Sequence, residues 1–253
     1  MSEWLGLGIL EIAGLLLIYF LGGLVKGGSG FGLPLITISV LPLIVPIDVA
    51  LAVNAVVMPI VNIFQYSASG MARETFRRFW PVVAGLVLGV PVGALFVHAI
   101  APETLTISLG AFVMAFALLT ALSPRIQVPP RFERQAGGVT GVLAGIVGAL
   151  TTANGPVFVI YLVGVGVERR AMVATLGLFF LVAGILVAGS FWTIGILDAR
   201  RVLIAAICIG PILAGMWVGN AIGERLPQAV FRRIVLLLLF LLGANMLVRT
   251  ALT

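Results

Sequence analysis

Apolar residues dominate the chain in long runs that are separated by short stretches of proline, glycine or charge. Runs of roughly 18 or more apolar residues are long enough to cross a bilayer as helices. The pattern therefore predicts an all-α polytopic membrane protein. We divide it into apolar segments at about 5–25, 32–45, 49–68, 79–99, 103–122, 137–151, 155–167, 171–195, 201–222 and 228–249.

Composition and charge agree with this class. The 253 residues are 61% hydrophobic and 9% charged, whereas a soluble domain carries about 25% charged residues. This excludes a water-soluble enzyme and a nucleic-acid-binding domain. The net charge of +6 comes from arginines in or beside the gaps between segments. Anionic lipid and the positive-inside bias account for them, so the expected partner is the bilayer and not nucleic acid.

No motif for catalysis or cofactor binding is present. The single cysteine, Cys208, and the single histidine, His98, cannot build a disulfide or a conventional zinc site. The chain also lacks a nucleophile elbow, an HExxH motif and a phosphate-binding loop. We therefore expect no catalytic residues, no metal and no cofactor. Glycines spaced by four residues, as at Gly85, Gly89 and Gly93, indicate close helix packing.

The chain resembles itself in two halves. We expect a first transmembrane repeat at 1–122, a linker at 123–136 and a second repeat at 137–253. The glycine-rich break at 28–34 matches the break at 151–156, and Asn54 lies over Thr175 at an offset of 121 residues. Such repeats of about five helical segments each are typical of secondary transporters.

Arginine positions favour two inverted repeats over two parallel ones. If the segment 137–167 enters the membrane and returns, eleven arginines lie inside and three outside, against nine and five if it crosses once. Residues 137–151 and 155–167 are also too short, at about 22 Å and 20 Å, to span a hydrocarbon core of about 30 Å. The sequence thus predicts two re-entrant or broken half-helix hairpins whose breaks meet near the midplane.

Both breaks are suited to binding an anion. In each break, glycine and proline lie at the start of a helix. The first N–H groups of that helix are unpaired and its dipole end is positive, which together favour an anion. Asn154 is the expected N-cap of the second of these helices. Gly28, Pro34 and Pro156 are expected hinge residues. The predicted substrate-binding residues are Ser29, Gly30, Phe31, Gly32, Asn54, Thr151, Thr152, Asn154, Gly155 and Thr175.

Several of these residues also have a purely structural interpretation. The glycines could serve helix packing alone, and Asn54 could hydrogen-bond to neighbouring helices instead of a substrate. Lys26 could add a cation to the anion site or extend to a lipid headgroup. Glu11 could carry a proton for coupling, although its match near Glu133 favours a position at the membrane edge.

The paired breaks resemble those of the TauE/SafE sulfite exporter family, also called toluene sulfonate uptake permeases. The resemblance rests on Gly28-Ser29-Gly30-Phe31-Gly32-Leu33-Pro34-Leu35, on Pro46 through Asn54, and on the copy from Asn154-Gly155-Pro156 through Ala171 and Thr175. It implies a multi-pass carrier of the bacterial cytoplasmic membrane for sulfite, sulfonates and other organosulfur anions. Phe31 and the Thr-Thr-Ala-Asn stretch depart from the glycine-richest family pattern, which bears on the substrate.

The resulting hypothesis is a secondary transporter, with export favoured, that moves a small sulfur-containing anion by alternating access. Coupling to an H⁺ or Na⁺ gradient is expected because no nucleotide site is present. Two alternatives remain: an anion channel lined by the same helix starts, and a membrane assembly protein without transport activity. The sequence leaves a homo-oligomer open.

Overall fold

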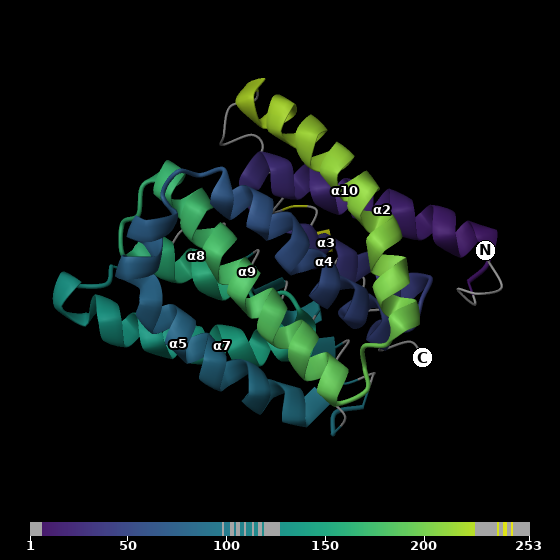
Figure 1. Cartoon of the computed structure of the whole chain (residues 1–253), viewed down its shortest axis with the longest axis horizontal. Helices are drawn as coiled ribbons and strands as arrows, with labels where there is room; N and C mark the ends of the chain where they lie inside the picture. The colour runs from purple at the N-terminus through teal and green to yellow at the C-terminus, as the bar shows by residue number, and fades with distance from the viewer. Residues whose placement is uncertain are drawn as a thin grey trace. The chain divides into compact units, whose positions relative to one another are not determined.

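The structure, a computed structural model, is helical throughout the described residues, which are 7–97, 99–101 and 127–225 with scattered positions in 104–118 and 237–244 (Figure 1). The all-α membrane class is therefore confirmed. His98, most of the segments 103–122 and 228–249, and residues 123–126 of the expected linker lie outside the described residues. The elements are α2 (Ile9–Ser29), α3 (Leu33–Val40), η1 (Leu41–Leu43), α4 (Ile47–Ser67), α5 (Ala72–Val97), η2 (Pro130–Phe132), α7 (Glu133–Thr151), α8 (Gly155–Gly164), α9 (Arg169–Thr193) and α10 (Ala199–Arg225).

Within the described part of the chain, five helices are long and apolar enough to cross a membrane: α2, α4, α5, α9 and α10. The chain leaves the helix after α2 and after α7, at the two predicted breaks, and continues in the short helices α3 and α8. α7 is longer than expected, because it begins at Glu133 and not at 137. Glu133, Arg134 and Gln135, which we expected in the linker, form the first turn of α7. The helix therefore has 19 residues and rises about 28 Å.

The helices form two compact units that do not follow the two sequence halves. The first unit contains α2, α3, residues 47–54 of α4, and α10. The second unit contains the rest of α4 together with α5, α7, α8 and α9. Each unit thus takes helices from both halves of the sequence. The division into sequence repeats, and their inversion, remain predictions.

Glycine contacts hold a long parallel helix pair in each unit. In the first unit, a Cβ atom at Gly215 or Gly219 of α10 would overlap the carbonyl oxygen of Phe20 or Leu24 in α2. In the second unit, a Cβ at Gly89 of α5 would overlap the Val142 oxygen of α7. The predicted role of these glycine series in close helix packing is therefore confirmed. The paired helices cannot accept a larger side chain at these positions.

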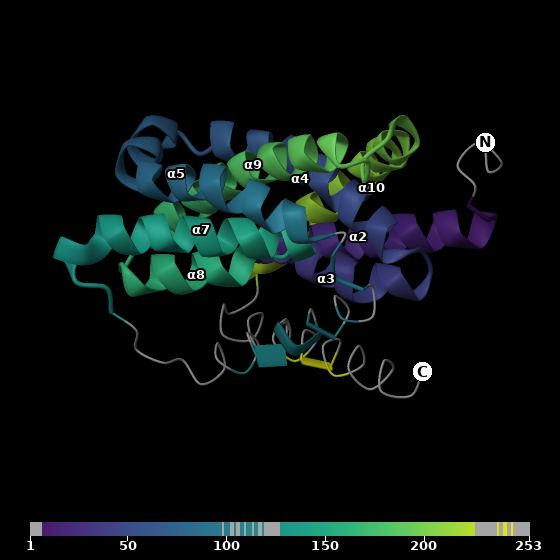
Figure 2. The same ribbon diagram turned by 90° about the horizontal axis from the view of Figure 1, so that it is seen from below.

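The short helices fold back on the helices that precede them. In the first unit, Gly22 of α2 faces α3, where a Cβ would lie 3.2 Å from the Thr37 methyl carbon. In the second unit, α8 runs antiparallel beside α7 (Figure 2), and a Cβ at Gly137 would lie 2.9 Å from the Tyr161 hydroxyl. Five aromatic rings fill the core of this second unit, with neighbouring centroids 4.9–6.2 Å apart. They belong to Phe79, Phe158, Tyr161, Phe179 and Phe180.

Candidate functional site

The backbone leaves the helix in the same way at both breaks. Gly30 and Thr152 adopt the left-handed conformation, with φ values of 82° and 54°. Each donates its N–H to the carbonyl oxygen four residues earlier, Lys26 at 2.7 Å and Gly148 at 2.8 Å. The left-handed region is natural for glycine and costly for threonine. Thr152 is the one non-glycine residue with positive φ in the described part of the chain, so its surroundings hold it in a strained conformation.

A hydroxyl group completes each turn. Ser29 Oγ donates to Val25 O at 2.7 Å and accepts from Phe31 N at 3.3 Å. Thr151 Oγ1 donates to Val147 O at 2.7 Å and accepts from Ala153 N at 3.0 Å. Both hydroxyls, predicted as substrate ligands, are thus engaged with the backbone of their own turn.

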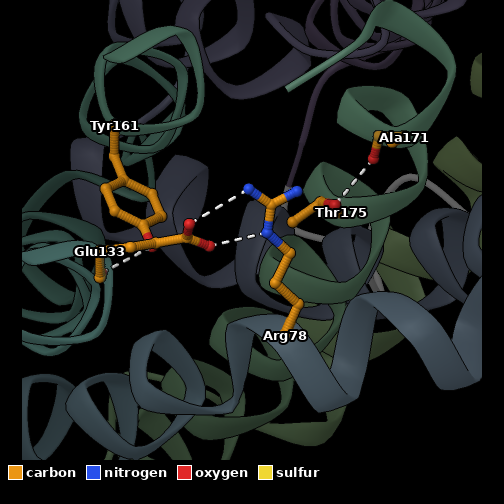
Figure 3. Close-up of polar contacts among 5 residues, drawn as sticks. All are labelled: Arg78, Glu133, Tyr161, Ala171 and Thr175. Atoms are coloured by element: carbon orange, nitrogen blue, oxygen red, sulfur yellow. Dashed lines mark hydrogen bonds and ion pairs between the residues drawn. The ribbon is translucent and has the colours of Figure 1, made fainter. Parts of the chain in front are cut away.

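The two breaks match at a spacing of 122 residues, which pairs Ser29 with Thr151 and Gly30 with Thr152. This differs by one residue from the offset of 121 between Asn54 and Thr175. At a spacing of 122, the residue that matches Asn54 is Leu176. Thr175 is buried, and its hydroxyl donates to Ala171 O at 2.7 Å within α9 (Figure 3). The structure therefore gives Asn54 and Thr175 different surroundings.

The helix after each break starts inside its unit. Gly32 and Asn154 occupy the N-cap positions of α3 and α8, and Pro34 and Pro156 follow in the first turn, as predicted. The first N–H groups of any α-helix have no acceptor in the helix itself. Because Gly32, Asn154 and the residues after them are buried, each unit presents a positive helix end in its interior. Such an end favours an anion.

The side chains at matching positions of the two breaks differ: where one break has a polar side chain, the other has glycine. Lys26 in the first unit corresponds to Gly148 in the second, and Gly32 corresponds to Asn154. A Cβ at Gly148 would lie 2.6 Å from Asn154 Nδ2, so the missing side chain makes room for the amide. Lys26 is 1% exposed and Asn154 is 3% exposed. At these two pairs of matching positions, each break holds one buried polar side chain, on opposite sides of the turn.

Asn154 holds the predicted N-cap position, but its side chain does not cap the helix. Its backbone is already helical, with φ −76° and ψ −4°, and its side chain makes no capping hydrogen bond. An N-cap side chain needs an extended backbone to reach the first turn. The Asn154 amide has no hydrogen-bond partner among the described residues. Among the described residues, every side-chain nitrogen or oxygen that is fully enclosed has a hydrogen-bond partner. Because the Asn154 amide has none, it is not fully enclosed and borders solvent-accessible space.

Asn54 is the centre of a buried hydrogen-bond cluster in the first unit. Its Oδ1 accepts from Tyr19 Oη at 2.9 Å and from Thr37 Oγ1 at 2.9 Å. All three residues are fully buried, and the cluster joins α2, α3 and α4. The interhelical interpretation of Asn54 is observed, while its contact with a substrate remains a prediction. The sequence analysis missed Tyr19 and Thr37, although hydroxyls in apolar segments were the available signal.

The carboxylates whose side chains the structure describes lie away from both breaks. They all occupy or precede the first turn of a helix, where the helix dipole favours them: Glu11, Asp48, Glu74, Glu133, Glu168 and Asp198. Glu11 accepts from Gly8 N at 2.8 Å at the start of α2. Glu133 binds Arg78 at 2.7 Å and 3.2 Å, and its backbone oxygen accepts from Tyr161 Oη at 3.1 Å (Figure 3). Arg201 contacts Asp48 and Asp198.

A sequence model of the sulfite exporter TauE/SafE family matches residues 15–246. The chain belongs to this family. The match includes both breaks and all the transmembrane candidates, although α2 begins before it. No curated protein and no solved structure matches the chain. TauE/SafE is a transporter family, and together with five apolar helices it makes this chain a multi-pass membrane protein.

Proposed function

We propose that this TauE/SafE protein is a secondary transporter that exports small sulfur-containing anions, such as sulfite or sulfonates, from bacteria. It lies in the cytoplasmic membrane, works by alternating access and uses an H⁺ or Na⁺ gradient. The observation that carries the proposal is Asn154, a buried amide at the start of α8 that has no hydrogen-bond partner among the described residues. A buried polar group is stable only when its hydrogen bonds are satisfied, and an anion can satisfy them.

The second break offers neutral donors to the anion. Asn154 Nδ2 and the first N–H groups of α8, including that of Gly155, donate to sulfite or sulfonate oxygens. Thr151 holds the turn in shape through Ala153 N, and Thr152 supplies the left-handed residue. A helix start combined with an amide binds an anion without a buried fixed charge, so the free energy needed to release the anion stays small.

The first break offers a helix start next to a cation. Gly32 has no side chain over the first N–H groups of α3, and Lys26 is buried in the last turn of α2. Ser29, Gly30 and Phe31 form the turn. Asn54 acts on this break through Thr37, since their hydrogen bond fixes α3 against α4. Gly28, Pro34 and Pro156 serve as hinges, and Thr175 stabilises α9.

Counterflow in proteoliposomes tests this proposal. Vesicles are preloaded with unlabelled sulfite, labelled sulfite is added outside, and sulfonates, sulfate, phosphate and chloride compete. We expect a transient overshoot of label that sulfonates suppress. Asn154→Leu should lower the apparent affinity about 10- to 100-fold, because a hydrogen bond to a charged group contributes about 1.5–3 kcal/mol. Asn62→Leu is the matched control, because it removes another buried amide of the second unit, one whose Nδ2 donates to Met58 O within α4.

Two outcomes would contradict the proposal. Rapid equilibration of label without overshoot would indicate an anion channel lined by the same helix starts. A folded protein that moves none of the anions would indicate an assembly protein or a carrier of another solute. Equal loss in Asn154→Leu and Asn62→Leu would remove Asn154 from the site while leaving transport itself established.

A further inference from the structure

The second unit gathers arginines at the end where α5 and α7 both begin. The two helices run parallel side by side (Figure 1), because successive positions on α5 meet successive positions on α7. Gly89 faces Val142 and Gly93 faces Ile146. The ion pair between Arg78 and Glu133 joins their first turns. The residues that precede α7 therefore lie beside the first turns of α5.

This end, which we call the basic end, carries a surplus of positive charge. Its two carboxylates are Glu74 and Glu133, and Glu133 is occupied by Arg78. The remaining arginines form no ion pair with any described residue. The positive residues of the basic end, all exposed, are Arg73, Arg77, Arg78, Arg131 and Arg134. The local net charge is thus +3, and the starts of two parallel helices add to the positive potential.

Aromatic side chains place the basic end at the surface of the hydrocarbon. Phe76, Trp80 and Phe132 are each about half exposed, and the Arg131 guanidinium lies 4.8 Å from the Phe132 ring centroid. Tryptophan side chains concentrate at headgroup depth, so Trp80 indicates that level. α5 also bends at Phe79, just before Pro81, where the proline removes a helix hydrogen bond. The bend sets the first turns of α5 apart from the rest of the helix.

We propose that the basic end is a binding site for the headgroup of an anionic phospholipid. Arg73 and Arg77 lie one turn apart on the same face of α5, and Arg134 is next to the residue that anchors Arg78. A guanidinium binds phosphate oxygens through two parallel hydrogen bonds. The exposed aromatic rings contact the acyl chains below the headgroup. A phospholipid carries a phosphodiester that pairs with the arginines and two acyl chains that cover the exposed aromatic rings. Free phosphate could pair with the arginines only.

Native mass spectrometry of the full chain in detergent tests the proposal, with phosphatidylglycerol and phosphatidylethanolamine as probes. We expect phosphatidylglycerol to bind at least tenfold more tightly. The triple variant Arg73→Gln, Arg77→Gln, Arg134→Gln should lose roughly a hundredfold in affinity, since each arginine near an anionic headgroup contributes about 1 kcal/mol. Arg200→Gln is the control, because Arg200 is exposed but lies at the start of α10 in the first unit.

Folding and the source of the phosphate are tested separately. Helical circular dichroism and the thermal midpoint in detergent should be unchanged in the triple variant, and single-arginine variants serve if it does not fold. Equal binding of the two lipids, or wild-type binding by the triple variant, would overturn the proposal. So would a loss in Arg200→Gln as large as in Arg77→Gln, or displacement of the lipid by inorganic phosphate at matched ionic strength. None of these readouts requires transport.

Discussion

The break after α2 and the break after α7 share one backbone design but differ in how they are held. The first is fixed by hydrogen bonds, since Tyr19 and Thr37 both donate to Asn54. The second is packed on aromatic rings, with Phe158 of α8 4.9 Å from Phe179 of α9. The Asn54 amide is therefore bonded within the first unit, whereas the Asn154 side chain of the second has no hydrogen-bond partner in the part of the chain that the structure describes. The two units thus differ in their buried amides: Asn54 positions helices, and Asn154 is available to a ligand.

The largest expected effect follows from filling the space that is present only at the second break. In Gly148→Ala, the new methyl group would lie 2.6 Å from Asn154 Nδ2 and displace the amide. We expect transport to fall about 10- to 100-fold, because overpacking a tight site costs about 1–3 kcal/mol. Counterflow measures this. Gly189→Ala, where the added atom meets nothing within 4 Å, should transport normally; equal losses would contradict the explanation.

Removing the Asn54 amide should lower the free energy of unfolding more than it lowers the affinity for the substrate. Asn54→Leu leaves the Tyr19 hydroxyl buried without its acceptor, which costs about 1–3 kcal/mol. In this variant, Thr37 retains Leu33 O at 3.0 Å as an alternative acceptor. Thr37→Ser should keep most of the stability that is lost in Thr37→Val, because serine keeps the hydroxyl that donates to Asn54. Denaturant unfolding in detergent measures both. Additive effects of Tyr19→Phe and Asn54→Leu would show that the cluster is not coupled.

Exchanging the left-handed residues tests whether the two turns are equivalent. Gly30→Thr gives the first break the residue of the second, and we expect it to lower the free energy of unfolding by about 1–2 kcal/mol. The backbone of Thr152 shows that the substitution is geometrically feasible. The thermal midpoint in detergent is the measurement. No change in the midpoint would mean that the first turn is as well supported as the second.

The smallest expected effect is at the ion pair between α5 and α7. Glu133→Gln should cost about 0.2–1 kcal/mol, because the Arg78 side chain is half exposed and solvent screens the pair. The hydrogen bond from Tyr161 remains, since it uses the backbone oxygen of Glu133. Unfolding at low and high salt measures the effect. A loss above 2 kcal/mol would show that the pair supports the hairpin directly.

The sequence predicted the breaks well because glycine, proline and the end of an apolar run are local signals. Gly30, Pro34 and Pro156 hold the positions expected of them. Asn154 holds the predicted N-cap position but makes no capping hydrogen bond, because residue type indicates a capping preference but not the φ and ψ that a side-chain cap requires. Tyr19 could not be placed, because its bond to Asn54 spans 35 residues. The grouping of α10 with α2 likewise depends on tertiary contacts that residue patterns do not encode.

The parallel pairing of α2 with α10 has a consequence for biosynthesis. The second unit ends at Leu197, so its helices are all synthesised before α10 begins. The glycine face of α2 at Gly23 and Gly27, which closes against Ile212 and Met216, waits for nearly the whole chain to be made. At bacterial elongation rates of about 5–20 residues per second, that interval is about 10–40 s. During it, lipid or insertion machinery must cover a surface meant for a helix not yet translated.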